Sequence, residues 1–250
     1  MNIEANLWIR RFHPSKEDAV RLVCFPHAGG SASYYFPVSQ ALSPVAEVLA
    51  VQYPGRQDRF AEPCVDDVHE LARQIFENLR PWTDRPLGLF GHSMGATVGY
   101  EVARLLEEHG TTPVHLFVSS GRAPSRRRDE RVHRMSDDEL IAEMRRLGGT
   151  DSSVLGDEDL LRMVLGAVRN DYKAVETYLH RPGPRLECPI TALVGDDDPT
   201  TTVEDAEPWR SHTNSAFDLK IFSGGHFYLN SHKTEILRII SEYLAAAEGR

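Results

Sequence analysis

A serine set in a G-x-S-x-G pattern is the first candidate for chemistry in this sequence. Ser93 lies in Gly91-His92-Ser93-Met94-Gly95, after a short apolar run and before a segment of helical character. In that order, strand then motif then helix, the pattern predicts a tight turn that lifts the hydroxyl out of a sheet on a strained backbone. The two glycines are expected because a Cβ there would clash with the neighbouring strand or helix. Ser93 is therefore the candidate nucleophile.

A serine hydroxyl is a poor nucleophile and needs a base within hydrogen-bond reach. Histidine is the usual base, because its pKa lies near neutrality. Among the 11 histidines, His226 follows a late predicted strand in a Gly-rich loop, at the edge of the sheet where Ser93 is expected. His27 and His92 are expected near Ser93, but their local chain direction does not suit proton abstraction. His226 is therefore the candidate base.

The base in turn needs a carboxylate, which fixes its tautomer and stabilises the imidazolium. The loop after the predicted strand 190–194 supplies three aspartates in a row, at positions 196 to 198. Asp198 is preferred, and spacing alone leaves Asp196 as a competitor. The order Ser93, Asp198, His226 is the Ser…Asp…His order of α/β-hydrolases.

Small residues directly after another predicted strand, 20–25, are the candidate oxyanion loop. The stretch Pro26-His27-Ala28-Gly29-Gly30-Ser31-Ala32 lets the backbone turn sharply and leaves N–H groups free to face a ligand. In serine hydrolases of this architecture that loop donates one oxyanion N–H. We expect the N–H of Ala28 to be one donor and the N–H of Met94 the other. The alternative is a Gly-rich turn without a catalytic role.

The elements that must position these groups alternate along the chain. Hydrophobic patterning predicts strands at 6–12, 20–25, 47–53, 87–90, 114–119, 190–194 and 217–222, and helices at 34–42, 65–79, 96–108, 136–147, 157–179, 203–212 and 234–247. Such alternation implies a mostly parallel sheet with helices on both faces, because parallel neighbours are joined across a sheet face. Ligands in such sheets bind at the carboxyl ends of the strands. We therefore expect residues 1–250 to form a single α/β domain with the α/β-hydrolase fold.

The alternation breaks between about residues 121 and 186, where two helices and no strand are predicted. An insertion that leaves from the catalytic edge is expected to cover the site as a lid. Its apolar residues could line an acyl pocket, although positions facing the core are favoured for them: Met135, Met144, Leu147, Met163, Leu165 and Val168.

Two loops are rich in arginine. Arg56 and Arg59 follow a turn and are expected to be solvated rather than functional. The Arg122–Arg134 cluster opens the insertion, with arginines at 122, 126, 127, 128, 131 and 134 against two acidic residues at 129 and 130. A solvated face is the favoured interpretation of this cluster. The more specific alternative is a contact for phosphate or for an acidic partner.

The composition excludes several classes of protein. A formal net charge of −9 argues against nucleic-acid binding, and no stretch approaches the roughly 18 apolar residues of a membrane helix. The polar start lacks the apolar region of a signal peptide. Cys24, Cys64 and Cys188 are an odd number without metal-ligand spacing, as in a cytosolic protein with reduced thiols. We expect a cytoplasmic enzyme that uses neither a metal nor an organic cofactor.

Five motifs in order resemble those of the type II thioesterases, the free-standing editing enzymes of polyketide and non-ribosomal peptide synthesis. They are Phe25–Gly30, Tyr53–Arg56, Gly91–Gly95, Gly195–Pro199 and Gly224–Phe227, and the resemblance spans almost the whole chain. It implies Ser93 as nucleophile, Asp198 rather than Asp196 as the acid, and His226 as base.

The resemblance also implies the substrate: acyl groups on the phosphopantetheine thiol of acyl-loaded carrier proteins, removed in trans so that a stalled assembly line can restart. Because carrier proteins are typically acidic, the Arg122–Arg134 cluster becomes a candidate docking contact. A medium- or long-chain fatty acyl thioesterase and a small-molecule carboxylesterase on the same fold are the alternatives. A non-catalytic binding module is a further class, which would be expected to carry a damaged triad or oxyanion loop.

Overall fold

A seven-stranded sheet forms the centre of the protein in the computed structural model, which describes residues 6–127, 130–149 and 157–248. The spatial order is β1-β3-β2-β4-β5-β6-β7, and every neighbouring pair is parallel except β1 with β3. The strands are β1 (Ile9–Arg10), β2 (Val20–Phe25), β3 (Ala46–Val51), β4 (Leu87–His92), β5 (His115–Ser119), β6 (Ile190–Gly195) and β7 (Phe217–Phe222). The expected mostly parallel sheet is confirmed.

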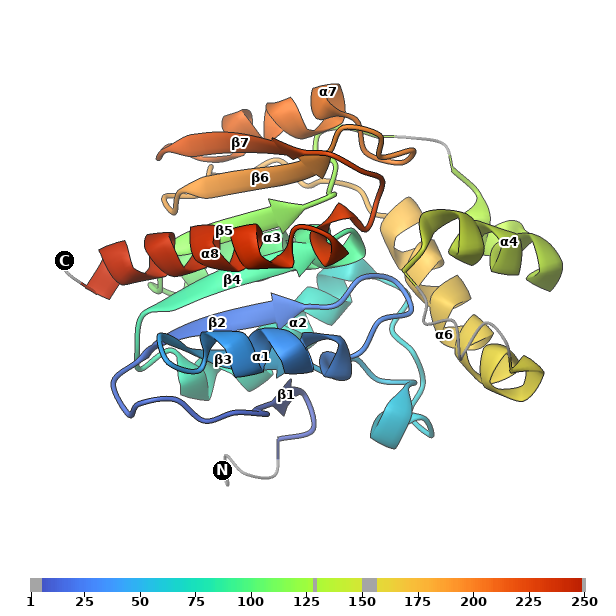
Figure 1. Ribbon diagram of the computed structural model, residues 1–250, viewed down its shortest axis with the longest axis horizontal. Helices are drawn as coiled ribbons and strands as arrows, with labels where there is room; N and C mark the ends of the chain where they lie inside the picture. The colour runs from blue at the N-terminus through green and yellow to red at the C-terminus, as the bar shows by residue number, and fades with distance from the viewer. Residues whose placement is uncertain (1–5, 128–129, 150–156, 249–250) are drawn as a thin grey trace.

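Helices cover both faces of this sheet, with α1 and α8 on one face and α2 and α3 on the other (Figure 1). Alternate residues of β2 explain the arrangement, because Leu22 and Cys24 pack with α1 and α8 while Val23 and Phe25 pack with α2 and α3. The helices are α1 (Phe36–Leu42), α2 (Val68–Leu79), α3 (Met94–Glu108), α4 (Asp137–Leu147), α6 (Glu158–Glu176), α7 (Val203–Ala206) and α8 (Lys233–Glu248). This is the expected α/β-hydrolase architecture.

Several predicted elements differ in detail from the observed ones. The strand predicted at 6–12 is only the two-residue β1, an antiparallel edge strand that pairs with the end of β3. The helix predicted at 203–212 is α7 followed by a 3-10 helix at Glu207–His212, with Pro208 in its first turn. Proline donates no backbone hydrogen bond and its ring crowds the preceding turn, so α7 does not continue through it.

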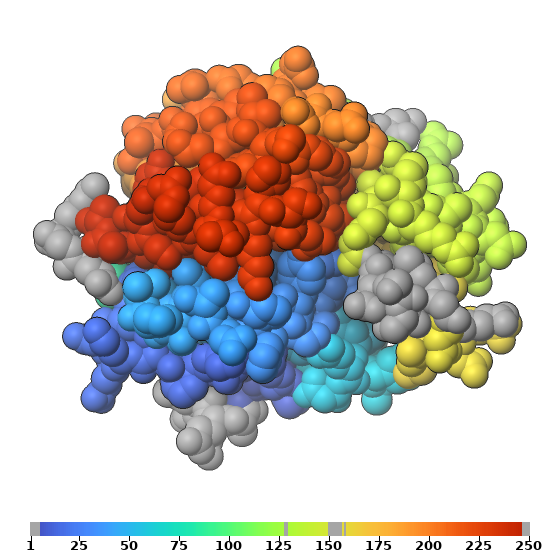
Figure 2. All heavy atoms as spheres, in the orientation of Figure 1, coloured from blue at the N-terminus to red at the C-terminus, as the bar shows by residue number. Residues whose placement is uncertain are grey.

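The insertion leaves the sheet after β5 and returns to it at β6. Its helices α4 and α6 project beyond the carboxyl ends of the strands and form a lobe at the side of the molecule (Figures 1 and 2). α4 begins with the capping box expected from Ser136 and Glu139. The lobe has an apolar cluster of its own, which includes Met144, Leu165 and Val168, whereas Met163 is exposed.

Neither a membrane-spanning helix nor a disulfide is found among the described residues. None of their helices is both long and apolar enough to cross a bilayer. Cys24, Cys64 and Cys188 are free thiols, the first and third buried and the second half-buried. Burial raises the pKa of all three thiols, so they are protonated near neutral pH.

Candidate active site

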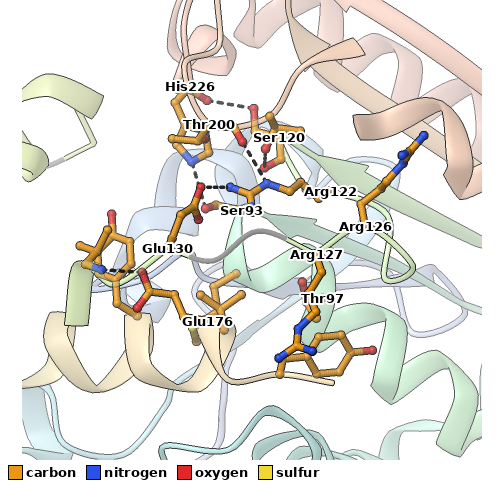
Figure 3. Close-up of a pocket in the computed structure, with 18 of the residues that line it drawn as sticks. Ser93, Thr97, Ser120, Arg122, Arg126, Arg127, Glu130, Glu176, Thr200 and His226 are labelled. Atoms are coloured by element: carbon orange, nitrogen blue, oxygen red, sulfur yellow. Dashed lines mark hydrogen bonds and ion pairs between the residues drawn. The ribbon is translucent and has the colours of Figure 1, made fainter. Parts of the chain in front are cut away.

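The turn that carries Ser93 is held in a strained conformation by close packing. Ser93 joins β4 to α3 with φ 56° and ψ −121°, and it faces the cavity drawn in Figure 3. A Cβ on Gly91 would lie 2.0 Å from the carbonyl oxygen of Gly95, and a Cβ on Gly95 would lie 2.1 Å from that of Phe25. Both contacts are with backbone and cannot give way. The sequence thus needs glycine at both positions, as expected.

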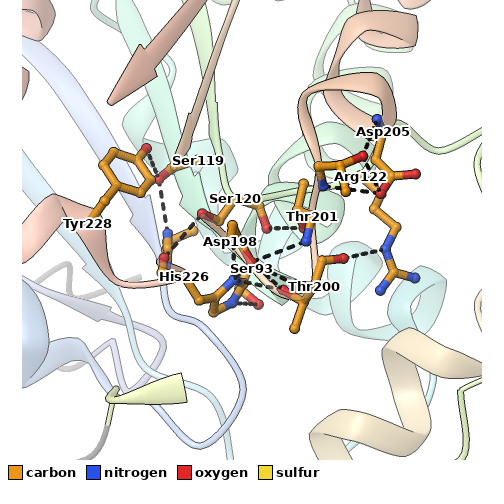
Figure 4. A network of polar contacts seen from close by, with 12 residues as sticks. Ser93, Ser119, Ser120, Arg122, Asp198, Thr200, Thr201, Asp205, His226 and Tyr228 are labelled. Carbon is orange, nitrogen blue, oxygen red and sulfur yellow. Dashed lines mark hydrogen bonds and ion pairs between the residues drawn. The ribbon is translucent and has the colours of Figure 1, made fainter. Parts of the chain in front are cut away.

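Ser93, His226 and Asp198 are joined by hydrogen bonds (Figure 4). His226 Nε2 lies 2.9 Å from Ser93 Oγ, and His226 Nδ1 lies 2.9 Å from Asp198 Oδ2. Each of the three follows the carboxyl end of a strand, β4, β6 or β7, so the parallel sheet brings them together from distant parts of the chain. The serine is half-buried and the other two are buried.

Asp198, rather than Asp196, reaches the imidazole. Asp196 is exposed and accepts a hydrogen bond from the amide of Gly224. Burial disfavours the charge on Asp198, but the hydrogen bonds and charge of His226, together with the Thr200 amide, outweigh it and lower the pKa of the carboxyl to about 2. Asp198 is therefore a carboxylate at neutral pH.

Two residues that the sequence analysis did not identify support this arrangement. The Thr200 hydroxyl donates to Asp198 Oδ1 at 2.9 Å and lies 2.8 Å from His226 Nδ1. The Ser120 hydroxyl donates to the carbonyl oxygen of His226 at 3.1 Å. Thr200 lies two residues after the candidate acid, a spacing that suits a turn in which Asp198 accepts local bonds. Ser120 follows β5 at the same edge of the sheet. That position is the feature by which the sequence could have indicated it.

His27 and His92 lie close to His226, and among the described histidines it is His226 that hydrogen-bonds to the serine hydroxyl. Burial, reinforced by the charge of His226, lowers the pKa of His27 to about 3 and lowers that of His92 well below its usual range. His92 Nδ1 lies 2.9 Å from the Ser119 hydroxyl. Both rings are therefore neutral at ordinary pH, and His27 forms part of the lining of the second cavity described below, whereas His92 is fully buried.

The candidate oxyanion loop passes close to Ser93, since Ala28, Met94 and Ser93 line one cavity. In the described part of the chain the amides of Ala28 and Met94 have no hydrogen-bond acceptor. The loop is held just before Ala28, where the Tyr53 hydroxyl donates to the carbonyl oxygen of Pro26 at 3.0 Å. Two unpaired donors thus remain beside the serine.

The expectation that Arg56 and Arg59 are solvated is wrong. Arg56 is 7% exposed and makes two hydrogen bonds to the buried carboxylate of Asp171, at 2.6 and 2.8 Å. Arg59 is 4% exposed, donates to the carbonyl oxygen of Gln52 and lies 4.1 Å over the ring of Trp8. Planar guanidinium groups are suited to such paired and stacked sites. The partner of Arg56 is far away in sequence, so no local pattern indicated it.

Two cavities meet at Ser93. The first has a volume of about 620 Å³ and the second about 610 Å³. Both are lined by Ser93, His226, Ala28, Leu147 and Tyr172. The insertion supplies a wall to each cavity, so a group bound to the serine can extend in two directions beneath α4 and α6.

The first cavity is lined by charged residues on its insertion side. Arg122 and Glu130 form an ion pair beside Ser93 and His226 (Figure 3). Arg126 and Arg127 are exposed and line the same cavity, whereas Arg128 and Asp129 of the cluster lie outside the described residues. Three described arginines of the cluster, Arg122, Arg126 and Arg127, therefore line the cavity that leads to the serine.

Apart from the Tyr172 phenol and two glycines, the described insertion residues that line the second cavity are apolar, and none carries a charged side chain. They come from α4 and α6, and they include four of the six residues considered for an acyl pocket: Met144, Leu147, Met163 and Val168. Met135 lines the first cavity and Leu165 packs inside the lobe. Among the described residues, no group of three or more His, Cys, Asp or Glu side chains is arranged to hold a metal ion.

Comparison with known proteins shows chains of similar sequence and of the same architecture. A family model described as a thioesterase domain matches residues 20–244. Thioesterase PikA5 of Streptomyces venezuelae is 53% identical, over 100% of this chain and 89% of that protein.

Two solved structures extend the likeness to three dimensions. The type II thioesterase BorB from the borrelidin biosynthetic cluster has a TM-score of 0.91 and 54% identity, and the match covers 95% of this chain and 97% of that one. RedJ, a thioesterase from the prodiginine biosynthetic pathway in Streptomyces coelicolor, has a TM-score of 0.87 and 36% identity, over 94% of both chains.

Proposed function

Because this chain belongs to the thioesterase family, we propose that it hydrolyses acyl thioesters on the phosphopantetheine arm of carrier proteins in a polyketide or non-ribosomal peptide assembly line. In that role it edits the line, since removal of a stalled acyl group frees the carrier thiol for another round. The enzyme would act in trans on acyl-loaded carrier proteins in the cytoplasm.

One observation carries the proposal: a nucleophile, a base and an acid form a single hydrogen-bonded chain at the junction of two cavities. A carrier-bound thioester is a long molecule with its reactive carbonyl in the middle. A serine at a junction suits such a substrate, because the acyl group and the pantetheine arm extend from the carbonyl in different directions.

The chemistry follows from the contacts. Ser93 Oγ attacks the thioester carbonyl while His226 Nε2 takes its proton, and Asp198 stabilises the imidazolium. The amides of Ala28 and Met94 bind the oxyanion, and such a donor typically contributes about 3 kcal/mol to lowering the barrier. His226 returns the proton to the departing thiol. Water then attacks the acyl-serine with His226 again as base, His226 passes that proton to the departing Ser93 Oγ, and the free acid leaves.

The insertion at 121–186 serves as a lid in this proposal. Its helices α4 and α6 line both cavities next to Ser93, so they exclude bulk water from the acyl-enzyme on these sides. Residues 1–250 then act as one catalytic domain in which the sheet supplies the triad and the insertion supplies most of the substrate walls.

The test is hydrolysis of a panel of acyl thioesters by wild type and by Ser93→Ala. The panel runs from acetyl to long-chain and aminoacyl groups on a carrier protein, with matched oxygen esters. Carrier-bound short or aminoacyl thioesters should be preferred, and the variant should lose roughly 1000-fold or more in kcat at an unchanged Tm. A preference for long fatty acyl chains or for oxygen esters would favour the two alternative enzymes. A wild type that neither turns over nor reacts with a fluorophosphonate would contradict the proposal.

A further inference from the structure

A carboxylate of the insertion holds the backbone of the candidate oxyanion loop. Asp171 lies in α6 and is 1% exposed. Its Oδ2 accepts a hydrogen bond from the amide of Gly29 at 2.8 Å, across 142 residues of sequence. Gly29 is the residue after Ala28, whose amide is a proposed oxyanion donor. The helix that forms part of the lid thus reaches into the catalytic loop.

Arg56 joins the same carboxylate to the next residue of the loop. Its guanidinium makes two bonds to Asp171 and a third, of 3.1 Å, to the carbonyl oxygen of Gly30. Asp171 and Arg56 therefore fix the N–H of Gly29 and the C=O of Gly30, which are neighbouring groups on one stretch of backbone. A lysine could not replace this fork of donors, because it is a single point charge.

Packing on the same face of α6 restricts the loop further. Val168 lies one helical turn before Asp171, and a Cβ on Gly29 would lie 2.6 Å from its Cγ2. Gly29 also has φ +76°, a conformation that favours glycine. The loop therefore fits against α6 by both a hydrogen bond and close van der Waals contact.

We infer that Asp171, together with Arg56, is a positioning residue for the reaction: it holds the Ala28 amide toward the oxyanion, so the insertion completes the oxyanion hole. This inference rests on the proposed function. The carboxylate touches neither the substrate nor the serine in this role. It acts through the loop, and its effect falls on the transition state more than on substrate binding.

The experiment compares Asp171→Asn with wild type in two readouts. The first is kcat and KM on an acyl thioester of a small thiol. The second is the inhibition constant of an alkyl boronic acid, whose tetrahedral adduct on Ser93 places an oxygen in the oxyanion hole. We expect kcat to fall about 10- to 100-fold, less than for complete loss of a donor, with KM within threefold. The affinity for the boronate should fall by about the same factor as kcat.

Asn170→Ala is the matched control. Asn170 precedes Asp171 in α6 and donates to the carbonyl oxygen of Val65 at 2.9 Å, so its loss removes an anchor of the same helix without touching the oxyanion loop. Its kcat and boronate affinity should stay at the wild-type values. An equal loss in both variants would assign the effect to general loosening of α6 and overturn the inference.

Arg56→Lys covers the case in which Asp171→Asn does not fold. This variant keeps the positive charge beside Asp171 and loses the bond to Gly30, so kcat and boronate affinity should fall together about tenfold. Unchanged values in a folded variant at position 171 or 56 would overturn the inference and leave the proposed function intact. A wild type that binds no boronate at Ser93 and hydrolyses no thioester would overturn both.

Discussion

Asp198 Oδ2 lies 2.9 Å from His226 Nδ1, while the nearby Asp196 accepts a bond from the backbone of Gly224 instead. Asp198→Asn replaces an acceptor with an amide and removes the charge that stabilises the imidazolium. We expect kcat to fall by roughly 10⁴-fold, the size of effect found when such an acid becomes an amide. Asp196→Asn is the paired control and should retain kcat within a few-fold. Steady-state hydrolysis of one acyl thioester measures both, and the reverse ranking would move the role to Asp196.

Charge reversal at the mouth of the first cavity tests carrier docking. Arg126→Glu/Arg127→Glu should lower kcat/KM on an acyl-carrier substrate about tenfold or more at low salt, because exposed like charges repel an acidic partner. Hydrolysis of the same acyl group on a small thiol should be unchanged. Arg80→Glu/Arg238→Glu makes the same change of net charge at exposed positions on α2's end and on α8. Equal losses in the two double variants would show a net-charge effect without a docking site.

Stability should decrease in mild acid because several histidines are buried in neutral form. Burial lowers the pKa of His115 and His212 to about 4, from about 6.5 in an unfolded chain. Below pH 6.5 these histidines are protonated in the unfolded state but stay neutral in the native state. The free energy of unfolding therefore decreases as the pH is lowered from 6.5 to about 4. Each such histidine contributes about 1 kcal/mol per pH unit within that window.

Urea unfolding at pH 7.5, 6.0 and 5.0 measures this dependence. His115→Gln removes one of these protons, so its free energy of unfolding should depend less steeply on pH than that of wild type. Equal stability of wild type at pH 7.5 and 5.0 would contradict the expectation.

Two glycine substitutions should have opposite effects on stability. Gly95→Ala brings a methyl group to 2.1 Å from the Phe25 carbonyl oxygen, so we expect a protein that is insoluble or has a Tm lower by more than 10 °C. The added methyl of Gly166→Ala in α6 meets no described atom within 4 Å apart from the backbone of its own helix, and it should stabilise the helix by about 0.5–1 kcal/mol. Thermal unfolding followed by circular dichroism separates the two cases. A Gly95→Ala variant as stable as wild type would show that the turn can open.

Local signals predicted most of the fold. Residues 87–108 read as strand, turn and helix because apolar spacing and small residues determine that geometry directly, and the structure contains it as β4, Ser93 and α3. The resemblance to type II thioesterases is confirmed by the relatives and by the solved structures. Candidate site residues could be chosen because each follows the carboxyl end of a parallel strand, where the fold collects them.

Contacts between residues far apart in the chain could not be predicted from the sequence. Arg56 and Asp171 are 115 residues apart, and neither lies in a pattern that names the other. An arginine in a polar loop is usually solvated, and only the packing of α6 against the loop after β2 changes that. The sequence placed His27 and His92 near Ser93, but the burial that lowers the pKa of both rings is a product of tertiary packing.

The position of Val168 and Asp171 on one face of α6 affects how the substrate range of this protein can be engineered. Val168 lines the second cavity and also abuts Gly29. A mutant library that reshapes the cavity should therefore vary Met144, Met163 and Val164 and keep residues 168 and 171 fixed. Variants at the fixed pair would trade turnover for any new selectivity, whereas variants at the other three positions leave the contacts between α6 and Gly29 in place.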